Sequence, residues 1–273
     1  MYKAKSAELE EPKPTFKYDA HVHEIFSSNF TVTKDHMHGS YQIIHDGITC
    51  LNFKLIEHSD KTTVLYVSEL FKCGGDERTG PALLKLIDKL AESIPRVKYI
   101  ELQDGSYIFL CNEEIREISL RNLKILTTGE SWYNSLGYKS EHHEENKQHN
   151  EQIITRTMDE LLPELLETSD DVITLKENAE ALFPGLSTTL TAKDYITAMF
   201  KAVPKTGCTE EQQNKAELLI ELVWRLGKLL QYDFILQKKV ERDPSFGGNK
   251  RSRRNPHSKR NKSKKRSRRT KPN

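Results

Sequence analysis

Strand-like and helix-like patterns alternate in the middle of the chain. Residues 62–71 are rich in β-branched and aromatic side chains, as expected for a buried or half-buried strand. A glycine-bearing loop follows, and over residues 81–91 apolar side chains recur at helical spacing. Residues 97–102 then resemble another strand. Strand, helix and strand in this order imply a parallel pair joined by a crossover, so the pattern predicts an α+β (α/β) fold: a mixed sheet with flanking helices.

Shorter strand signals surround this central unit. The partly alternating residues 16–26 favour a strand, and residues 41–58 contain two strand-like runs around the turn signal Asp46-Gly47. A second turn signal, Asp104-Gly105, precedes another strand-like run at residues 107–110. We therefore expect a β-rich first half.

The region after residue 112 is less regular. Residues 113–129 fit either a helix or an extended segment. Ser131 can cap a short helix that Gly137 ends, and a strand is expected at Tyr138.

Helical signals dominate beyond a polar, loop-like stretch at residues 141–152, which predicts a domain boundary. Residues 153–166 favour a helix with a break at Pro163. Thr191 and Asp194 have the spacing of a capping box, which predicts a helix that continues to Phe200.

The strongest helical pattern covers residues 209–240. Thr209 and Gln212 form a capping-box pair at its start. A continuous apolar stripe follows, made of Leu219, Leu222, Val223, Leu226, Leu229 and Leu230. Such a stripe needs a partner surface, so we expect a small helical module that either packs on the sheet domain or self-associates.

These patterns predict five segments. They are a flexible N-terminal arm (1–14), an α/β domain (15–140), a linker (141–152), a helical module (153–240) and a Lys/Arg-rich tail (241–273).

Charge is unevenly distributed along the chain. Residues 250–273 hold 13 of the 42 basic residues and no acidic one, so residues 1–249 retain 29 basic against 40 acidic side chains, a formal net charge of −11. A segment of this composition cannot bury a core, and we expect it to be disordered. Dense positive charge predicts salt-dependent contact with nucleic acid, although a nuclear localisation signal, docking on an acidic protein surface or a simple solubilising role fits the same residues. The expected contacts are Arg251, Arg253, Arg254, Lys259, Arg260, Lys264, Lys265, Arg266, Arg268 and Arg269.

The cysteines and the apolar runs bear on the compartment. Cys50, Cys73, Cys111 and Cys208 are widely spaced, without a Cys-x-x-Cys pair, which favours four buried reduced thiols. The first thirty residues lack a signal-like apolar run, and no segment approaches the roughly 20 apolar residues of a membrane span. We therefore expect an intracellular protein, nuclear or cytoplasmic, without a membrane partner.

The loop of the central unit is a candidate phosphate cradle. Gly74, Gly75 and Gly80 can adopt backbone angles denied to other residues, and Pro81 suits the first turn of a helix. A helix N-terminus beside such a loop presents unpaired N–H groups that can bind a phosphate or pyrophosphate.

Three stretches together resemble the GCN5-related N-acetyltransferase (GNAT) family. LYVSELFKCGGDERTGPALLKLIDKLAES is similar to its fourth strand, pyrophosphate loop and helix, RVKYIEL to its fifth strand, and SWYNSLGY to its later helix. The loop departs from the family pattern, because Arg78 stands where the first glycine is expected and only Gly80 matches the second. The segment LTTGESWYNSLGY is also similar to acetyltransferase-like proteins of large DNA viruses, which would place the protein in a host cell or virion.

The resemblance implies acetyl transfer from acetyl-CoA to an amine. It implies Tyr133 as the proton donor to the departing thiolate and Glu69 as the base. The coenzyme-binding residues that it implies are Leu70, Phe71, Gly74, Gly75, Arg78, Thr79 and Gly80. The alternative is a non-enzymatic protein that kept the fold and binds nucleic acid through its tail.

A second alternative is a metal-dependent hydrolase. His21 and His23 lie in a His-x-His pattern, which on a strand would place both imidazoles on one face, and His36 and His38 repeat the spacing. An amidohydrolase-like barrel needs about eight strand–helix units, which the helical second half does not offer. We therefore expect no metal.

Overall fold

The strand–helix–strand unit predicted in the middle of the chain is the centre of the computed structural model. The structure describes residues 16–71, 73, 79–111, 117–166 and 168–242. Strand β4 (Thr63–Leu70) leads into helix α2 (Gly80–Ser93), and strand β5 (Val97–Gln103) returns parallel to β4. The predicted parallel pair is therefore confirmed.

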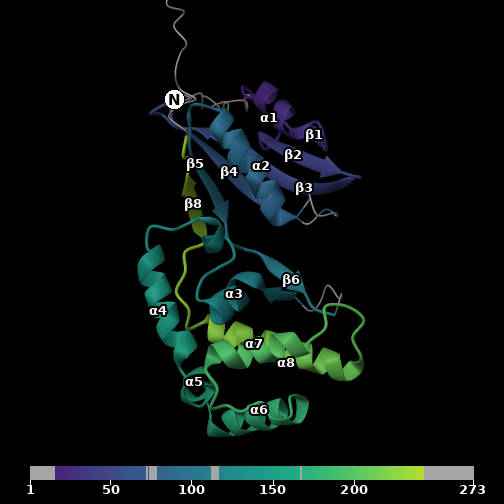
Figure 1. The fold of residues 1–273 in the computed structure, drawn as a ribbon, viewed down its shortest axis with the longest axis vertical. Coiled ribbons are helices and arrows are strands. Elements are labelled where there is room, and N and C mark those ends of the chain that lie inside the picture. Colours follow the sequence, from purple (N-terminus) through teal and green to yellow (C-terminus); the bar gives the residue numbers. More distant parts are fainter. Residues whose placement is uncertain (1–15, 72, 74–78, 112–116, 167, 243–273) are drawn as a thin grey trace, which may run out of the picture. The chain divides into compact units, whose positions relative to one another are not determined.

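A six-stranded mixed sheet extends from this pair in the order β1-β2-β3-β4-β5-β8 (Figure 1). Every neighbouring pair in it except β4–β5 is antiparallel. The remaining strands are β1 (Thr31–Asp35), β2 (Ser40–His45), β3 (Ile48–Glu57) and β8 (Ile235–Lys239). The turn between β2 and β3 contains Asp46 and Gly47, both with positive φ, as the sequence predicted.

Two helices cover one face of this sheet. Helix α1 (Asp19–Phe26) and α2 lie side by side over it (Figure 1). Their apolar residues, including Phe26, Leu83 and Ile87, join Phe53 and Leu65 of the strands in the first hydrophobic core. The sequence prediction of a strand at residues 16–26 is wrong, because Val22 and Phe26 are buried at the four-residue spacing of a helix.

A second hydrophobic core is helical. It is built on α3 (Leu120–Thr128), α4 (His143–Thr155), α5 (Met158–Leu165), α6 (Ser169–Leu182), α7 (Ala192–Ala202) and α8 (Glu210–Gly227). The hairpin of β6 (Tyr107–Phe109) and β7 (Glu117–Ser119) packs against it. The apolar stripe of α8 is buried in this core, so its partner surface lies within the chain.

The two cores do not follow the expected segment boundaries. Residues 107–128, assigned to the α/β domain, contribute Leu110, Ile118 and Leu123 to the helical core. The end of the helical module returns to the sheet as β8, beside β5. Residues 141–152, expected to be a linker, belong mostly to helix α4. The described residues up to Val240 accordingly belong to one compact unit.

Several helix ends also differ from the sequence predictions. Helix α8 ends at Gly227 instead of 240, because the chain beyond it returns to the sheet, where residues 235–239 pair with β5. Pro163 lies within α5 and does not break it, while the break falls between α4 and α5, where Thr157 caps α5. The capping box at Thr209 and the helix cap at Thr191 are confirmed. No strand begins at Tyr138, although Lys139 forms a bridge with Gln237.

The cysteines form two disulfides, Cys50–Cys73 and Cys111–Cys208. The prediction of four reduced thiols is therefore wrong, because the fold brings together residues that are 23 and 97 positions apart in the sequence. Since disulfides are typical of oxidising environments, the argument for a reducing compartment loses its support.

Within the described ranges, no helix is both long enough and apolar enough to cross a bilayer. The N-terminal arm and the basic tail lie outside those ranges, apart from Glu241 and Arg242.

Candidate functional site

The parallel strands β4 and β5 stop pairing before β4 ends. Their register runs from Thr63 opposite Val97 to Val67 opposite Leu102. On its other side β4 continues alongside β3, with Leu70 opposite Leu51. Residues 68–70 of β4 therefore have no register partner on β5, and we call this unpaired stretch the open end of the β4–β5 pair.

A β-bulge accompanies this end of β4. Val67 lies opposite Phe53 and Glu69 opposite Asn52, so Ser68 is an extra residue between them. The Ser68 hydroxyl donates to the Asn52 carbonyl oxygen at 3.1 Å. A bulge bends its strand and increases its twist, which turns the end of β4 out of the regular sheet.

The segment from Ser131 to Tyr138 lies across both strand ends. A Cβ atom added to Gly80 would lie 2.8 Å from the ring of Trp132 and 3.7 Å from Leu70, so this ring lies at the start of α2 and the end of β4. Tyr133 lies close enough to Asp104, the residue after β5, to be affected by its charge. We call Leu70, Gly80, Asp104, Trp132 and Tyr133 the strand-end site.

Tyr133 is buried within the strand-end site. Its ring packs edge-to-face on Trp132, with the ring centroids 4.7 Å apart, and on Tyr138 at 6.3 Å. Burial raises the pKa of the Tyr133 phenol, and the nearby Asp104 carboxylate raises it further. The hydroxyl is therefore protonated at neutral pH, and its raised pKa makes it a weaker acid than an ordinary tyrosine.

Glu69 faces another environment. It points to the sheet face opposite α1 and α2, where it is exposed and accepts a hydrogen bond from Asn52 Nδ2 at 3.5 Å. The structure thus places Glu69 and Tyr133 at the same end of β4 but on different sides of the sheet. Leu70 is half-buried against the sheet core, and Phe71 is exposed.

The predicted phosphate cradle is described only in part. Thr79 precedes α2, Gly80 and Pro81 begin it, and its first turn contains no acidic residue. Gly74, Gly75 and Arg78 lie outside the described residues, so their expected contacts stay predictions.

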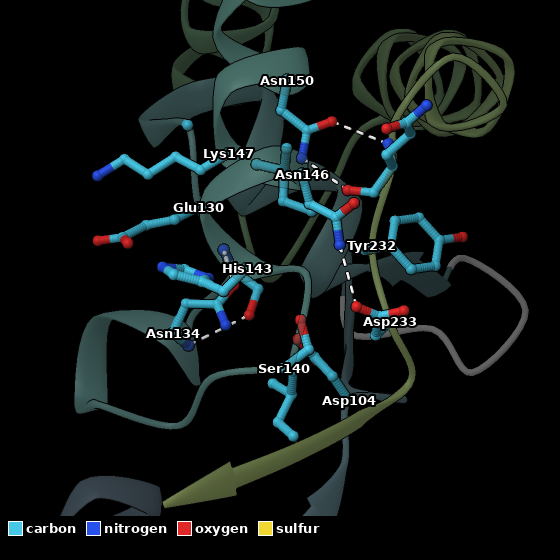
Figure 2. Close-up of a pocket in the computed structure, with 15 residues that line it drawn as sticks. Asp104, Glu130, Asn134, Ser140, His143, Asn146, Lys147, Asn150, Tyr232 and Asp233 are labelled. Carbon is cyan, nitrogen blue, oxygen red and sulfur yellow. Dashed lines mark hydrogen bonds between the residues drawn. The ribbon is translucent and has the colours of Figure 1, made fainter.

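A polar hollow adjoins the strand-end site through Asp104 and Ser131 (Figure 2). Its cavity of about 20 Å³ has room for about one water molecule. The lining includes four buried polar residues, Asp104, Ser131, His143 and Asn150. Because these residues come from the end of β5, the 131–138 segment and α4, the hollow joins the two parts of the fold.

Hydrogen bonds connect α4 across the polar hollow to the segment before β8 (Figure 2). Asn150 Nδ2 donates to the Gln231 carbonyl oxygen at 2.8 Å, and Asn150 Oδ1 accepts from the Gln231 amide at 2.9 Å. Asn146 donates to Asp233 at 3.1 Å. These bonds hold the chain on its way to β8.

Burial shifts the pKa of two groups in the hollow in the direction that favours the neutral form. Burial raises the pKa of the Asp104 carboxyl, although hydrogen bonding from Ser131 and the charge of Arg121 oppose this. Burial likewise lowers the pKa of His143, with Lys139 adding to the effect. Among the described atoms, Asp104 Oδ2 has no hydrogen-bond partner, which makes it the natural partner of a water in the cavity.

The histidine pattern does not form the arrangement that a metal hypothesis needs. His21 and His23 lie on helix α1, where side chains two positions apart point in different directions. His23 Nδ1 lies 3.0 Å from Ser27 Oγ, and His38 pairs with Asp35 at 2.6 Å. Within the described part of the chain, no group of three or more His, Cys, Asp or Glu side chains has a metal-binding arrangement.

The sequence did not single out the polar hollow. Asp104 was interpreted as a turn residue, and His143, Asn146 and Asn150 fell in the expected linker. Their spacing of three and four residues is the periodicity of one helix face, so a search for polar rather than apolar periodicity would have found them.

Comparisons with known proteins do not assign a family to the chain: no protein-family model matches the sequence, and no curated protein is similar to it.

Proposed function

We propose that the chain is a GNAT-like N-acyltransferase that binds acetyl-CoA at the open end of the β4–β5 pair. The observation that carries this proposal is the register of the strands, which ends at Val67 and Leu102 while β4 continues to Leu70 beyond the bulge at Ser68. A pantetheine arm has amide groups that can pair with the open edge of a strand. Residues 68–70 offer such an edge beside the N-terminus of α2.

The described residues fit this ligand with one constraint. The open backbone of β4 suits the pantetheine, and the α2 N-terminus suits a phosphate group. Trp132, however, already lies against Gly80. The coenzyme would therefore lie along the Trp132 ring and could not approach the glycine backbone directly.

Tyr133 and Glu69 would act from the two sides of the strand pair. Acetyl-CoA supplies an activated acyl group whose transfer to an amine releases a thiol. Tyr133 holds a proton on its hydroxyl oxygen at neutral pH and can donate it to the leaving thiolate, although burial and the Asp104 charge raise its pKa and so weaken it as an acid. The Glu69 carboxylate, exposed on the opposite face, can accept the proton of the incoming ammonium group.

Calorimetric titration of the full chain with acetyl-CoA tests the proposal. We expect saturable binding, and much weaker binding of 3′-phosphoadenosine diphosphate, which lacks the pantetheine that the open strand would hold. The absence of both heat and a thermal shift at millimolar acetyl-CoA would refute the proposal.

A second candidate function rests on the segregation of charge along the sequence. Thirteen basic residues between 250 and 273 follow a body with a net charge of −11. We infer sequence-independent contact of this tail with nucleic acid, driven by counterion release. This function is compatible with the first and does not need a catalytic site.

A further inference from the structure

Among the described residues, no helix covers one face of the six-stranded sheet. α1 and α2 pack on the face that carries Leu65, Val67 and Ile100, each at most 4% exposed. The register identifies the side chains of the other face, because neighbours in a row across a sheet point the same way. We call this second surface the open sheet face.

Two rows of side chains cross the open sheet face from β3 to β5. The first row is Ile56, Val64 and Tyr99, and the second is Lys54, Tyr66 and Glu101. Tyr99 is 41% exposed and the other apolar members are half-buried. Among the described residues, Ile56, Val64, Tyr66 and Tyr99 join neither of the two hydrophobic cores. A contiguous surface of this kind marks an interaction site.

The charges in the second row are ordered. The Lys54 ammonium lies 5.2 Å from the centroid of the Tyr66 ring, and Glu101 accepts a hydrogen bond from Gln237 at 2.9 Å. Lys54 and Glu101 therefore flank Tyr66 on opposite sides. The row carries one positive and one negative end, with an aromatic ring between them.

This order is self-complementary. If two copies pack face to face about a two-fold axis that runs along β4, each strand keeps its direction and β3 lies over β5 of the other copy. Lys54 then meets Glu101 of the second copy, and Ile56 meets Tyr99. Val64 and Tyr66 meet their own counterparts. Every residue of both rows finds a complementary group, as an isologous interface requires.

We propose that the open sheet face is a homodimer interface in which two copies stack their sheets about an axis along β4. The basic tail of the chain is a poorer occupant, because the second row balances its lysine with a glutamate and offers a polycation no net attraction. The two rows over three strands cover on the order of 200 Å² per copy, well below the roughly 800 Å² per partner of a standard interface. The dimer is accordingly weak and depends on concentration.

Sedimentation equilibrium of the full chain between about 1 μM and about 1 mM tests the proposal, since this range brackets the affinity of a small interface. Wild-type protein should change from monomer to dimer. Lys54→Glu and Glu101→Lys should each raise the dimer dissociation constant by about tenfold or more, because both symmetric contacts become repulsive. The double variant should regain dimerisation, which also shows that each exchange is compatible with folding. Lys89→Glu, the same charge change on exposed α2, should have no effect.

If something other than a second copy covers the open sheet face, the sedimentation experiment gives a different result. A wild-type chain that stays monomeric over the whole range would overturn the proposal, as would a double variant no better than the single ones. If dimers form only after residues 243–273 are removed, the tail competes for the face and the proposal is also wrong. Binding of acetyl-CoA is measured separately, so failure of the dimer leaves the proposed function standing.

Discussion

Removal of the Cys111–Cys208 disulfide is predicted to destabilise the chain more than removal of Cys50–Cys73. The long-range bridge joins the end of the β6 region to the segment before α8 and is flanked by buried residues of the helical core. Cys50–Cys73 joins β3 to the chain just after β4 and belongs to the sheet core. The Cys111→Ala/Cys208→Ala variant therefore has a matched control in Cys50→Ala/Cys73→Ala.

The magnitude follows from the loops that the bridges close. The sequence separations are 97 and 23 residues. On the chain-entropy model these loops correspond to about 4.7 and about 3.4 kcal/mol of stabilisation through the unfolded state. The difference of about 1.3 kcal/mol is the firmer quantity, because strain and residual structure affect the absolute values more.

Urea unfolding without reductant, followed by tryptophan fluorescence, measures these losses. Trp132 packs against the sheet core and reports on it, while Trp224 of α8 is exposed. We expect both double variants to unfold at lower urea, the Cys111/Cys208 pair by more. Four reactive thiols in denatured, unreduced wild-type protein would refute the reasoning, as would a Cys50/Cys73 variant that loses more stability than the other.

Three further predictions concern the site and the tail. Tyr133→Phe should lower the rate of acetyl transfer by roughly 10²-fold while leaving acetyl-CoA affinity unchanged, measured by thiol release and calorimetry; weakened binding with normal turnover would contradict the assigned role. The pKa of His143 is lower in the folded chain than its ordinary value of 6.5. The free energy of unfolding is therefore highest above pH 6.5 and decreases as the pH falls through the pKa of the folded chain. His143→Gln should therefore flatten the loss of unfolding free energy between about pH 7.5 and about pH 5, and an unchanged pH profile would count against this. Deletion of residues 250–273 should abolish retention on DNA or RNA at low salt, whereas equal retention of the shortened chain would exclude the tail as the contact.

Local patterns were sufficient to predict the elements whose residues also pack locally. β4, α2 and β5 followed from β-branched runs and helical periodicity, because each buries one face against its sequence neighbours. The same reasoning failed at residues 16–26, where partial alternation competes with a four-residue spacing that only packing on α2 resolves. It also failed at β8, since the pairing of residues 235–239 with β5 depends on a contact that is distant in sequence.

The candidate site was predictable in part for a similar reason. Tyr133 is singled out only through the resemblance of the segment SWYNSLGY to a GNAT helix, and its role stays a prediction. Asp104 and His143 are 39 positions apart, and only the fold brings them to one hollow. The disulfides are the clearest case, because the spacing of four cysteines does not determine which pairs meet. The Ser68 bulge could not be predicted either, because it depends on how β3 and β4 pair, which the sequence does not determine.

The central claim is that the open end of β4 binds the pantetheine of acetyl-CoA beside Trp132. The most direct test is the Trp132 emission of a Trp224→Phe variant, which has a single tryptophan, during titration with acetyl-CoA. Because the ring lies against Gly80 and Leu70, we predict a saturable change in its emission, with the affinity that calorimetry gives for the wild type. Emission that stays constant up to millimolar acetyl-CoA would contradict the account.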